Sequence, residues 1–502
     1  MKRRDFLQRL AAAPLLFGAA DALSAEVPDP SPLPAPAPAA PAPRFVGLQI
    51  SPSSLFAEGI EPCLDRLQDL AGVNALLVYT HRYQGYGGMW AAPTTDPQAR
   101  RLPLIWVRTH EAYYRGTFLR HAERGPETDY ADRDILDELA EPCRRRGIRV
   151  IARFQEGVGH DALAAIAGWS AVGSIDITGR RTMAPCWNHP AYRAWWLATV
   201  EDLFKSYPTL GGLKIGSERN GPFSNVLINP RGDARQAAVC FCTHCRTAAR
   251  ARGLDPERAL EGMTKLVEFT EALRGNRPVP VDGAGVTLLR MLMRYPEILA
   301  WEQLYHDARE SLMREVYGVI KQISPTALVG WHVHHSVSMD PITRAMTDYQ
   351  RMAEYGDFIK PVLYHDITGV RLNGVLQAYA GGVLKDLPPA ELLPLLYALL
   401  GYDPTREPTY QDLTKRGFST DYVYRETRRC VTAVGGRCAV YPGIGLDIGG
   451  APAHDATSGA GEAVTAALRA GAGGIIISRE YDEMREPSLR AVGRALRAYP
   501  SP

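Results

Sequence analysis

The stretch of this sequence best suited to chemistry is an apolar run that ends in polar residues. Residues 211–217 read Gly-Gly-Leu-Lys-Ile-Gly-Ser and lead directly into Glu218, Arg219 and Asn220. A buried strand whose carboxyl end opens into a polar site has this pattern, and the Gly-Pro pair that follows ends the strand. Glu218 is therefore the first candidate for a catalytic carboxylate. A salt bridge to Arg153 or Lys214 is the alternative role.

Three thiols follow about twenty residues later, at Cys240, Cys242 and Cys245, close enough in sequence to share one cation. Four thiolates form a closed structural zinc site. Cys186 is the natural fourth ligand, whereas His244 is a poorer one because it is crowded between two ligands. Disulfide bonds are the alternative. The remaining cysteines are expected to be buried thiols or to form a bridge: Cys63, Cys143, Cys430 and Cys438.

These residues need a scaffold, and the sequence predicts a parallel barrel. Eight short apolar runs are expected to be strands: 45–51, 73–83, 148–156, 212–220, 327–336, 357–366, 438–447 and 473–480. Helical patterns fall between and after them: 60–71, 131–146, 190–206, 298–323, 342–355, 419–434, 460–470 and 488–498. Strands that are apolar on both faces and alternate with helices indicate a parallel sheet, and eight such units predict a (β/α)₈ TIM barrel with long βα-loop insertions. A doubly wound open sheet is the alternative.

In a barrel of this kind the active site lies at the carboxyl ends of the strands. Two carboxylates that face each other across a bond can share its hydrolysis, one as acid and the other as nucleophile or base. Asp447 is favoured narrowly over Glu480 as the partner of Glu218, since Glu480 could instead pair with Arg479. The residues expected to contact a substrate are His81, Tyr83, Glu156, Asn220, His332, His334, Tyr364, His365, Asp366 and Arg479.

Histidines are concentrated at the end of the fifth predicted strand, which reads Trp-His-Val-His-His over residues 331–335. Alternation along a strand places His332 and His334 on one side, with His335 at the mouth. A catalytic metal held by these residues and His365 is conceivable. Hydrogen bonding to a substrate and a structural role are the competing interpretations.

The amino-terminal residues predict export rather than folding. Lys2-Arg3-Arg4-Asp5-Phe6-Leu7, followed by a short apolar segment, resembles a twin-arginine signal, so residues 1–25 are expected to engage the twin-arginine translocase. Residues 26–43, mostly Pro and Ala, form a stiff linker, and 44–502 form the barrel domain. We expect a periplasmic or secreted protein without a stable membrane anchor. The net charge of +2 over 502 residues suggests no nucleic-acid partner.

A Glu at the end of strand four, followed by Cys-Phe-Cys-Thr-His-Cys, resembles glycoside hydrolase family 42 and its relatives in clan A. The resemblance implies that Glu218 is the acid/base and that Cys186, Cys240, Cys242 and Cys245 hold a structural zinc. The chain departs from the family at Ser217, where the family has Asn, and at Asp447, where the family has a nucleophilic Glu. The family's trimerisation domain is also expected to be absent.

Three functions follow from these observations. The first is an exported hydrolase of oligosaccharides or polysaccharides, with β-galactosidase activity not assumed. The second is a noncatalytic glycan-binding barrel, which the missing strand-seven Glu favours. The third is a metal-dependent hydrolase that uses the histidines.

Overall fold

The computed structural model describes residues 44–82, 105–121, 129–156, 166–228, 233–275, 277–452 and 456–499. The description below concerns the unit Pro43–Pro502. The predicted leader, the linker and Tyr83 lie outside the described residues. Within the part of the chain that is described, no helix has the length and apolar character needed to cross a membrane.

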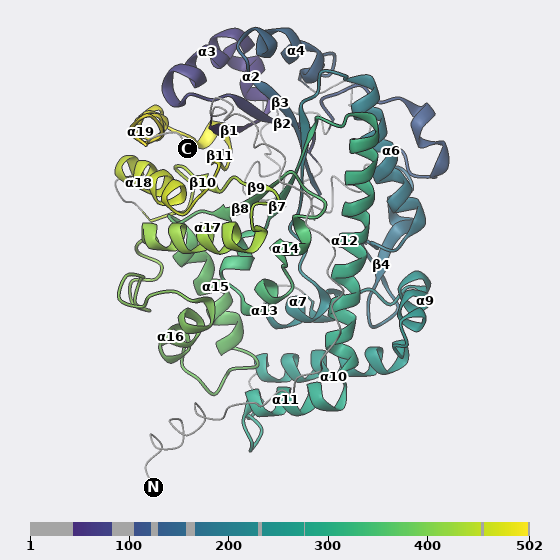
Figure 1. The fold of residues 1–502 in the computed structure, drawn as a ribbon. Helices are drawn as coiled ribbons and strands as arrows, with labels where there is room; N and C mark the ends of the chain where they lie inside the picture. Colours follow the sequence, from purple (N-terminus) through teal and green to yellow (C-terminus); the bar gives the residue numbers. More distant parts are fainter. Residues whose placement is uncertain are drawn as a thin grey trace, which may run out of the picture. The chain divides into compact units, whose positions relative to one another are not determined.

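Eight strand positions close into a parallel barrel, as the sequence predicts (Figure 1). The strands are β1 (Phe45–Ile50), β2 (Ala75–Arg82), β3 (Arg149–Glu156), β6 (Gly212–Ser217), β7 (Leu328–Val333), β8 (Phe358–Leu363), β9 (Ala439–Val440), β10 (Gly443–Gly445) and β11 (Gly474–Ser478). β11 pairs with β1 and closes the ring, so the open-sheet alternative is wrong. The seventh predicted strand is divided into β9 and β10, because Pro442 between them has no N–H to donate to a ladder.

Helices surround the barrel, and extra ones fill the long connections. Their bounds are α2 (Pro52–Glu58), α3 (Ile60–Ala71), α4 (Ile135–Arg145), α6 (Pro190–Ser206), α7 (Pro222–Ile228), α8 (Ala234–Ala237), α9 (Thr243–Ala251), α10 (Pro256–Arg274), α11 (Ala284–Arg294), α12 (Glu297–Ile323), α13 (Pro341–Ala345), α14 (Tyr349–Met352), α15 (Thr368–Ala380), α16 (Pro389–Leu400), α17 (Thr420–Val434), α18 (Ala456–Arg469) and α19 (Glu486–Ala498). Short 3₁₀ helices lie at η1 (Glu111–Gly116), η2 (Trp169–Val172), η3 (His335–Ser338) and η4 (Tyr481–Glu483), and β4 (Gly173–Ile175) pairs with β5 (Arg181–Pro185).

Two predicted helices, 60–71 and 190–206, have the bounds of α3 and α6, but the one expected at 342–355 is two short helices. Asp348 interrupts it, since its carboxylate accepts the backbone N–H groups of Gln350 and Arg351 and starts α14. A carboxylate at a helix start accepts hydrogen bonds from the first backbone N–H groups, which have no partner within the helix.

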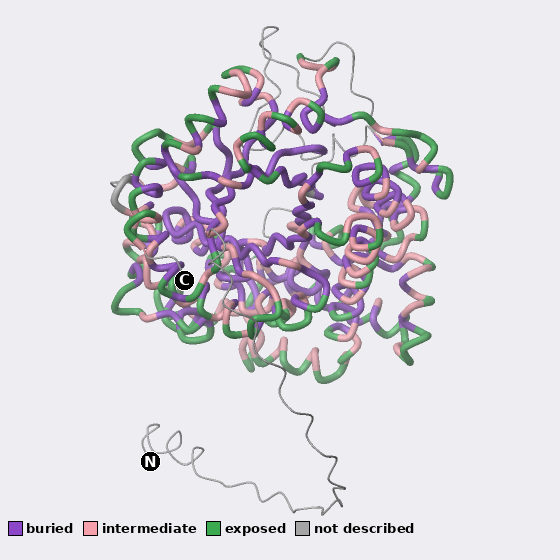
Figure 2. The backbone as a smooth tube through the Cα atoms, turned by 45° about the horizontal axis from the view of Figure 1, so that its top comes forward, coloured by how far each residue is buried: buried purple, intermediate pink, exposed green. Residues whose placement is uncertain are grey.

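The outer faces of the strands pack against the helices, and Figure 2 shows the strands buried inside the helical ring. Ile215 and Trp331 are typical of this layer, with 1% and 3% of their surface exposed. Burial of a large apolar side chain stabilises a fold by roughly 1.5–3 kcal/mol. This layer holds the strand ends in fixed positions around the barrel mouth.

The interior of the barrel changes from apolar to polar toward the carboxyl ends of its strands. Leu77, Ile151, Phe358 and Ile476 form a buried apolar cluster. Gly330 is required there, because any side chain at this position would overlap the ring of Phe358. The next inward-facing positions are polar and buried: Gln49, Tyr79, Arg153, Lys214 and Lys360. Charges buried in such a layer shift the pKa values of their neighbours, so the layer shapes the electrostatics of the site above it.

Candidate active site

Glu218 lies just after β6 and contacts two histidines, His332 within β7 and His334 directly after it. Its Oε1 lies 3.0 Å from Nε2 of His332, and its Oε2 lies 3.7 Å from Nε2 of His334. A Cβ at Gly216 would lie 3.0 Å from the Cβ of His332, so a side chain at this position would crowd the histidine. The Glu218 side chain remains 34% exposed. The histidines hold the carboxylate in position, and its exposed part can contact a substrate.

The environment of Glu218 and His332 favours a charged carboxylate and a neutral imidazole. Burial raises the pKa of the Glu218 carboxyl, but His334, the hydrogen bond from His332 and Arg371 together hold that pKa well below its usual range. Burial, with the nearby cations Lys214 and Lys360, holds the pKa of His332 well below its usual range. An ionised Glu218 that accepts a hydrogen bond from a neutral His332 is therefore the state at neutral pH.

Glu480 is the second residue after β11, and it forms a buried ion pair. Nη1 of Arg153 donates to its Oε1 at 2.6 Å, and the hydroxyl of Tyr79 donates to the same oxygen at 3.1 Å. Its other oxygen, Oε2, has no hydrogen-bond partner among the described residues. The anticipated pairing with Arg479 is wrong, because Arg479 donates to Glu483 instead.

Two lysines lie between these carboxylates inside the barrel. Lys214 of β6 and Lys360 of β8 are 0% exposed, and neither Nζ has a hydrogen-bond partner among the residues described. Burial and the neighbouring cation Arg153 lower the pKa of Lys360 to about 7, and those two causes together with Lys360 lower the pKa of Lys214 well below its usual value. Sequence reasoning missed Lys360, although a lysine within the apolar run Phe-Ile-Lys-Pro-Val-Leu was a readable signal.

Glu218 and Glu480 lie on opposite sides of the barrel. The ring of strands runs β1-β2-β3-β6-β7-β8-β10-β11 and back to β1, so β6 and β11 are four positions apart in both directions. Both lysines interact electrostatically with both carboxylates, which places all four groups around one interior. Two carboxylates that face each other across a barrel mouth can act on opposite sides of one bond.

Asp447, the favoured second carboxylate, lies in a different environment. Its Oδ1 accepts Nε of Arg485 at 2.7 Å and Oγ of Ser488 at 3.1 Å, and its Oδ2 accepts the backbone N–H of Arg485 at 2.8 Å. These bonds tie the end of the seventh strand position to the start of α19. Both oxygens are occupied, so the contacts of Asp447 are those of a structural anchor.

Glu156 and His81 face the helices rather than the barrel interior. Glu156 is 2% exposed and accepts Nε and Nη2 of Arg219 at 2.9 and 2.6 Å, Oγ of Ser217 at 2.9 Å, and the hydroxyl of Tyr192. His81 is 1% exposed and packs against the ring of Phe154. Alternation explains the placement of Glu156, since Arg153 of β3 takes an inward position. His81 faces outward because the register of β2 shifts between Tyr79 and His81.

The other predicted contact residues lie at the barrel rim. Oδ1 of Asn220 accepts Oγ of Ser336 at 3.4 Å. Tyr364 is buried under the guanidinium of Arg371, 5.6 Å from its ring centroid, and burial raises its pKa to about 12. His365 and Asp366 are about 5% exposed, and Oδ1 of Asp366 accepts the backbone N–H of Ile367.

The histidines do not form a metal site. His335 turns away from His332, and its ring nitrogens contact Tyr422, Thr368 and Arg371. Across the described parts of the chain, the ligand atoms of at least three His, Cys, Asp or Glu residues converge in one place, at Cys186, Cys240, Cys242 and Cys245. The suggested catalytic metal at the histidines is therefore wrong.

The four Sγ atoms of this cysteine cluster lie within 4.8 Å of one another, and all eight cysteines of the chain are free thiols. Sγ of Cys186 lies 3.5 Å from that of Cys242 and 3.4 Å from that of Cys245. A tetrahedral zinc with bonds of about 2.3 Å needs sulfurs about 3.8 Å apart, so the cluster is compatible with a metal site. The backbone N–H of Ile175 and the amide of Asn188 donate to two of the sulfurs, as is usual around thiolates.

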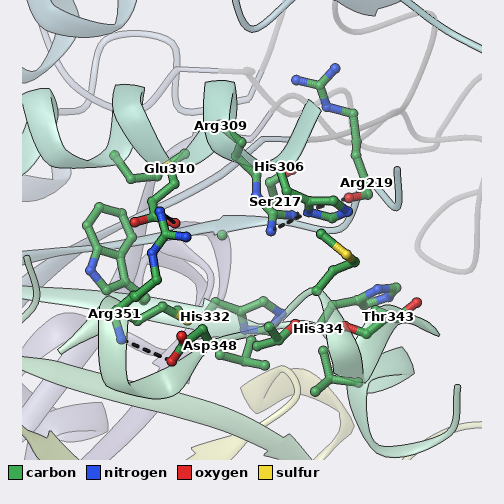
Figure 3. A pocket seen from close by; sticks show the side chains of 18 of the residues that line it. Ser217, Arg219, His306, Arg309, Glu310, His332, His334, Thr343, Asp348 and Arg351 are labelled. Atoms are coloured by element: carbon green, nitrogen blue, oxygen red, sulfur yellow. Dashed lines mark hydrogen bonds and ion pairs between the residues drawn. The ribbon is translucent and has the colours of Figure 1, made fainter. Parts of the chain in front are cut away.

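A cavity of about 210 Å³ opens between the ends of β6 and β7, the helix α12 and the segment that contains α13 and α14 (Figure 3). Both histidines that contact Glu218 line it, as do Ser217, Arg309 and Arg351. The cavity is smaller than the roughly 300–1,000 Å³ of pockets for drug-sized ligands. It suits one sugar residue beside His332 and His334, the two histidines that contact Glu218.

Comparison with solved structures agrees with the barrel. The chain is similar to a β-galactosidase from the Antarctic haloarchaeon Halorubrum lacusprofundi, with a TM-score of 0.51 and 14% identity over 90% of this chain and 57% of that one. It is also similar to the PgaB (BpsB) glycoside hydrolase domain of Bordetella bronchiseptica (TM-score 0.49, 10% identity, 91% of this chain and 98% of that one). A third is the catalytic domain of the β-amylase of Paenibacillus polymyxa (TM-score 0.46, 11% identity, 92% and 100%).

The likeness to the haloarchaeal enzyme agrees with the class of fold, the (β/α)₈ barrel. The chain spans 57% of the length of the haloarchaeal enzyme. No protein-family model matches the sequence, and no curated protein matches it.

Proposed function

We propose that this protein is an exported glycoside hydrolase that cleaves O-glycosidic bonds of an oligosaccharide or polysaccharide. The observation that carries the proposal is the position of Glu218 and Glu480 on opposite sides of the barrel, at the carboxyl ends of its strands. The fold agrees with it, because the haloarchaeal protein of similar fold is a β-galactosidase.

In this proposal Glu218 is the acid/base group and Glu480 the second carboxylate. Glu218 is ionised in the free protein, which suits the base half of its role; the acid half requires a bound substrate to remove water from the carboxyl and raise its pKa. The hydrogen bond from Nη1 of Arg153 fixes the position of the Glu480 carboxyl, as a nucleophile or base requires. Glu480 takes the role first assigned to Asp447, whose two oxygens are bonded to Arg485 and Ser488.

The test is turnover of a broad panel of aryl glycosides and polysaccharides by the wild type, Glu218→Gln and Glu480→Gln. Loss of general acid–base catalysis lowers rates by about 10²–10⁴-fold. Glu354→Gln is the matched control, because this surface carboxylate pairs with Arg314 and faces no part of the barrel mouth. Activity that survives in both barrel variants would refute the assignment. The anomer released reports the carboxyl separation, about 5–5.5 Å for retention and about 6.5–9.5 Å for inversion.

We also propose that the cysteine cluster binds a structural zinc, as in family 42, of which this chain would be a divergent relative. When bound, zinc would cross-link Cys186 to the start of α9. The carbonyl of the adjacent Pro185 accepts Nη1 of Arg219 at 2.6 Å, so the cross-link supports the residue next to Glu218. The twin-arginine signal supports export to the periplasm or beyond, after folding.

A noncatalytic glycan-binding barrel is the second candidate. The burial of Glu480, 4% exposed, and the anchoring role of Asp447 favour it. Sugar binding without turnover by the wild type would decide for this function.

A further inference from the structure

Arg309 of α12 is a cation at the rim of the active site, and it has no carboxylate partner among the described residues. It lines the cavity beside His332 and His334 (Figure 3). Its Nη2 donates to Nδ1 of His306 at 3.1 Å, and its Nη1 reaches the carbonyl of Arg219 at 3.4 Å. Neither contact neutralises the guanidinium, so its full positive charge faces the cavity.

A buried relay holds Arg309 in this position. Glu302, 1% exposed, accepts Nε2 of His306 at 3.2 Å, and it also accepts the N–H of Phe223 and the hydroxyl of Ser224. Burial lowers the pKa of His306, so its ring is neutral and its Nδ1 can accept from Arg309. Gly221 leaves the space that Glu302 occupies. The Arg309 side chain is thus oriented before any ligand binds.

The other charges of the cavity are already engaged. Arg219 is paired with Glu156. Glu310 is paired with both Arg314 and Arg351, at 2.9 and 3.0 Å. Asp348 accepts two backbone N–H groups at the start of α14. Among the described residues that line the cavity, Arg309 is thus the cation without a carboxylate partner, and Asp348 is the anion without a cationic one.

Arg371 of α15 repeats the arrangement near Glu218. Its Nη1 donates to Nδ1 of His335 at 2.9 Å, and it has no ion pair with a described carboxylate. Burial lowers the pKa of His335 well below its usual range, so this histidine is also a neutral acceptor. A neutral imidazole does not cancel the charge of the guanidinium that it holds. Arg309 and Arg371 therefore keep their positive charge and their remaining N–H donors. An anionic ligand can form charge-assisted hydrogen bonds with such a guanidinium.

We propose that the cavity is a subsite for an acidic sugar, whose carboxylate or sulfate is bound by Arg309 beside Glu218. This inference rests on the proposed function for the glycan and goes beyond it in naming the chemical class. A planar guanidinium matches the two oxygens of either anion. Arg371 raises the local potential and draws an anionic substrate to the same rim.

The experiment measures binding and turnover separately. Isothermal titration uses oligosaccharides of the β-linked glucose and galactose series that differ at C6 in a single group: a hydroxymethyl, a uronate carboxylate or a 6-O-sulfate. We expect the acidic members to bind about 10- to 100-fold more tightly than the neutral ones, the range for one charge-assisted hydrogen-bonded pair. In Arg309→Gln the preference should fall to within about twofold, and Arg309→Lys should retain part of it.

Arg314→Gln is the matched control, because this arginine lies on the same helix but is paired with Glu310 and Glu354. It should keep the preference for acidic sugars. Preference for the uronate or for the sulfate identifies which anion the site takes. Equal binding of neutral and acidic members, no binding of any member, or a preference that survives in Arg309→Gln while the variant stays folded would overturn the inference. Acidic preference without turnover would instead reject the proposed hydrolase and leave the subsite standing.

Discussion

Lys360 offers the most quantitative test of the electrostatics inside the barrel. Its Nζ is buried without a hydrogen-bond partner among the described residues, and a Cβ at Gly443 would lie 2.8 Å from it. Burial and Arg153 lower its pKa from 10.5 to about 7, against the opposing pull of Glu218 and Glu480. Replacing Lys360 with Met keeps the length of the side chain and removes the charge. We expect this variant to be more stable than the wild type.

The size of the gain follows from linkage. Between pH 7 and 10.5 the unfolded chain binds more protons at this lysine than the native protein does, so the free energy of unfolding rises with pH. Below pH 7 the lysine is charged in both states and the cost of burial is present in full. Integration between the two pKa values gives a cost of about 4 kcal/mol at pH 7 and about 2 kcal/mol at pH 9. Lys360→Met removes it, so its advantage should shrink by about 2 kcal/mol between these pH values.

The assay is urea unfolding, followed by tryptophan fluorescence at pH 7 and pH 9, for the wild type and Lys360→Met. Lys205→Met serves as the control, because Lys205 is exposed, pairs with Glu201 and has a raised pKa. It should show no stabilisation at either pH. An equal stability change at both pH values for Lys360→Met would refute the reasoning, since a pKa near 7 requires the change to depend on pH.

Two further variants test the rim and the cysteine cluster. His332→Asn removes the hydrogen bond that lowers the pKa of Glu218, so the limb of the pH–kcat/KM profile governed by Glu218 should shift to higher pH. A shift of the basic limb identifies Glu218 as the acid, and a shift of the acidic limb identifies it as the base or nucleophile. An unchanged profile contradicts the pairing of His332 with Glu218. Cys245→Ser should lower the zinc content measured by mass spectrometry from about one per chain to near zero and reduce the Tm, since a structural zinc adds folding free energy. Cys438→Ser, outside the cluster, should keep its zinc; full zinc in Cys245→Ser would exclude the site.

Local patterns were enough to predict the barrel. Apolar runs bounded by turn residues and separated by helical periodicity are set by residues close in sequence, so all eight strand positions and the bounds of α3 and α6 could be read from them. The four cysteines could be grouped for a related reason, because three lie within six residues and thiols have few other roles in such a run.

The partner of each carboxylate could not be read in the same way. Glu480 meets Arg153 from 327 positions away, and Glu218 meets His332 from 114. Asp447 has the right place in the sequence for a nucleophile, yet the turn that starts α19 brings Arg485 and Ser488 onto its oxygens.

The amino-acid sequence by itself thus determined which strands form and which residues lie at their ends. Only the tertiary structure decided which charges are paired, which remain unpaired and which face the helices. The physical reason is that strand periodicity is a short-range property, whereas the pKa and contacts of a buried group depend on strands that the closed barrel brings together from across the chain.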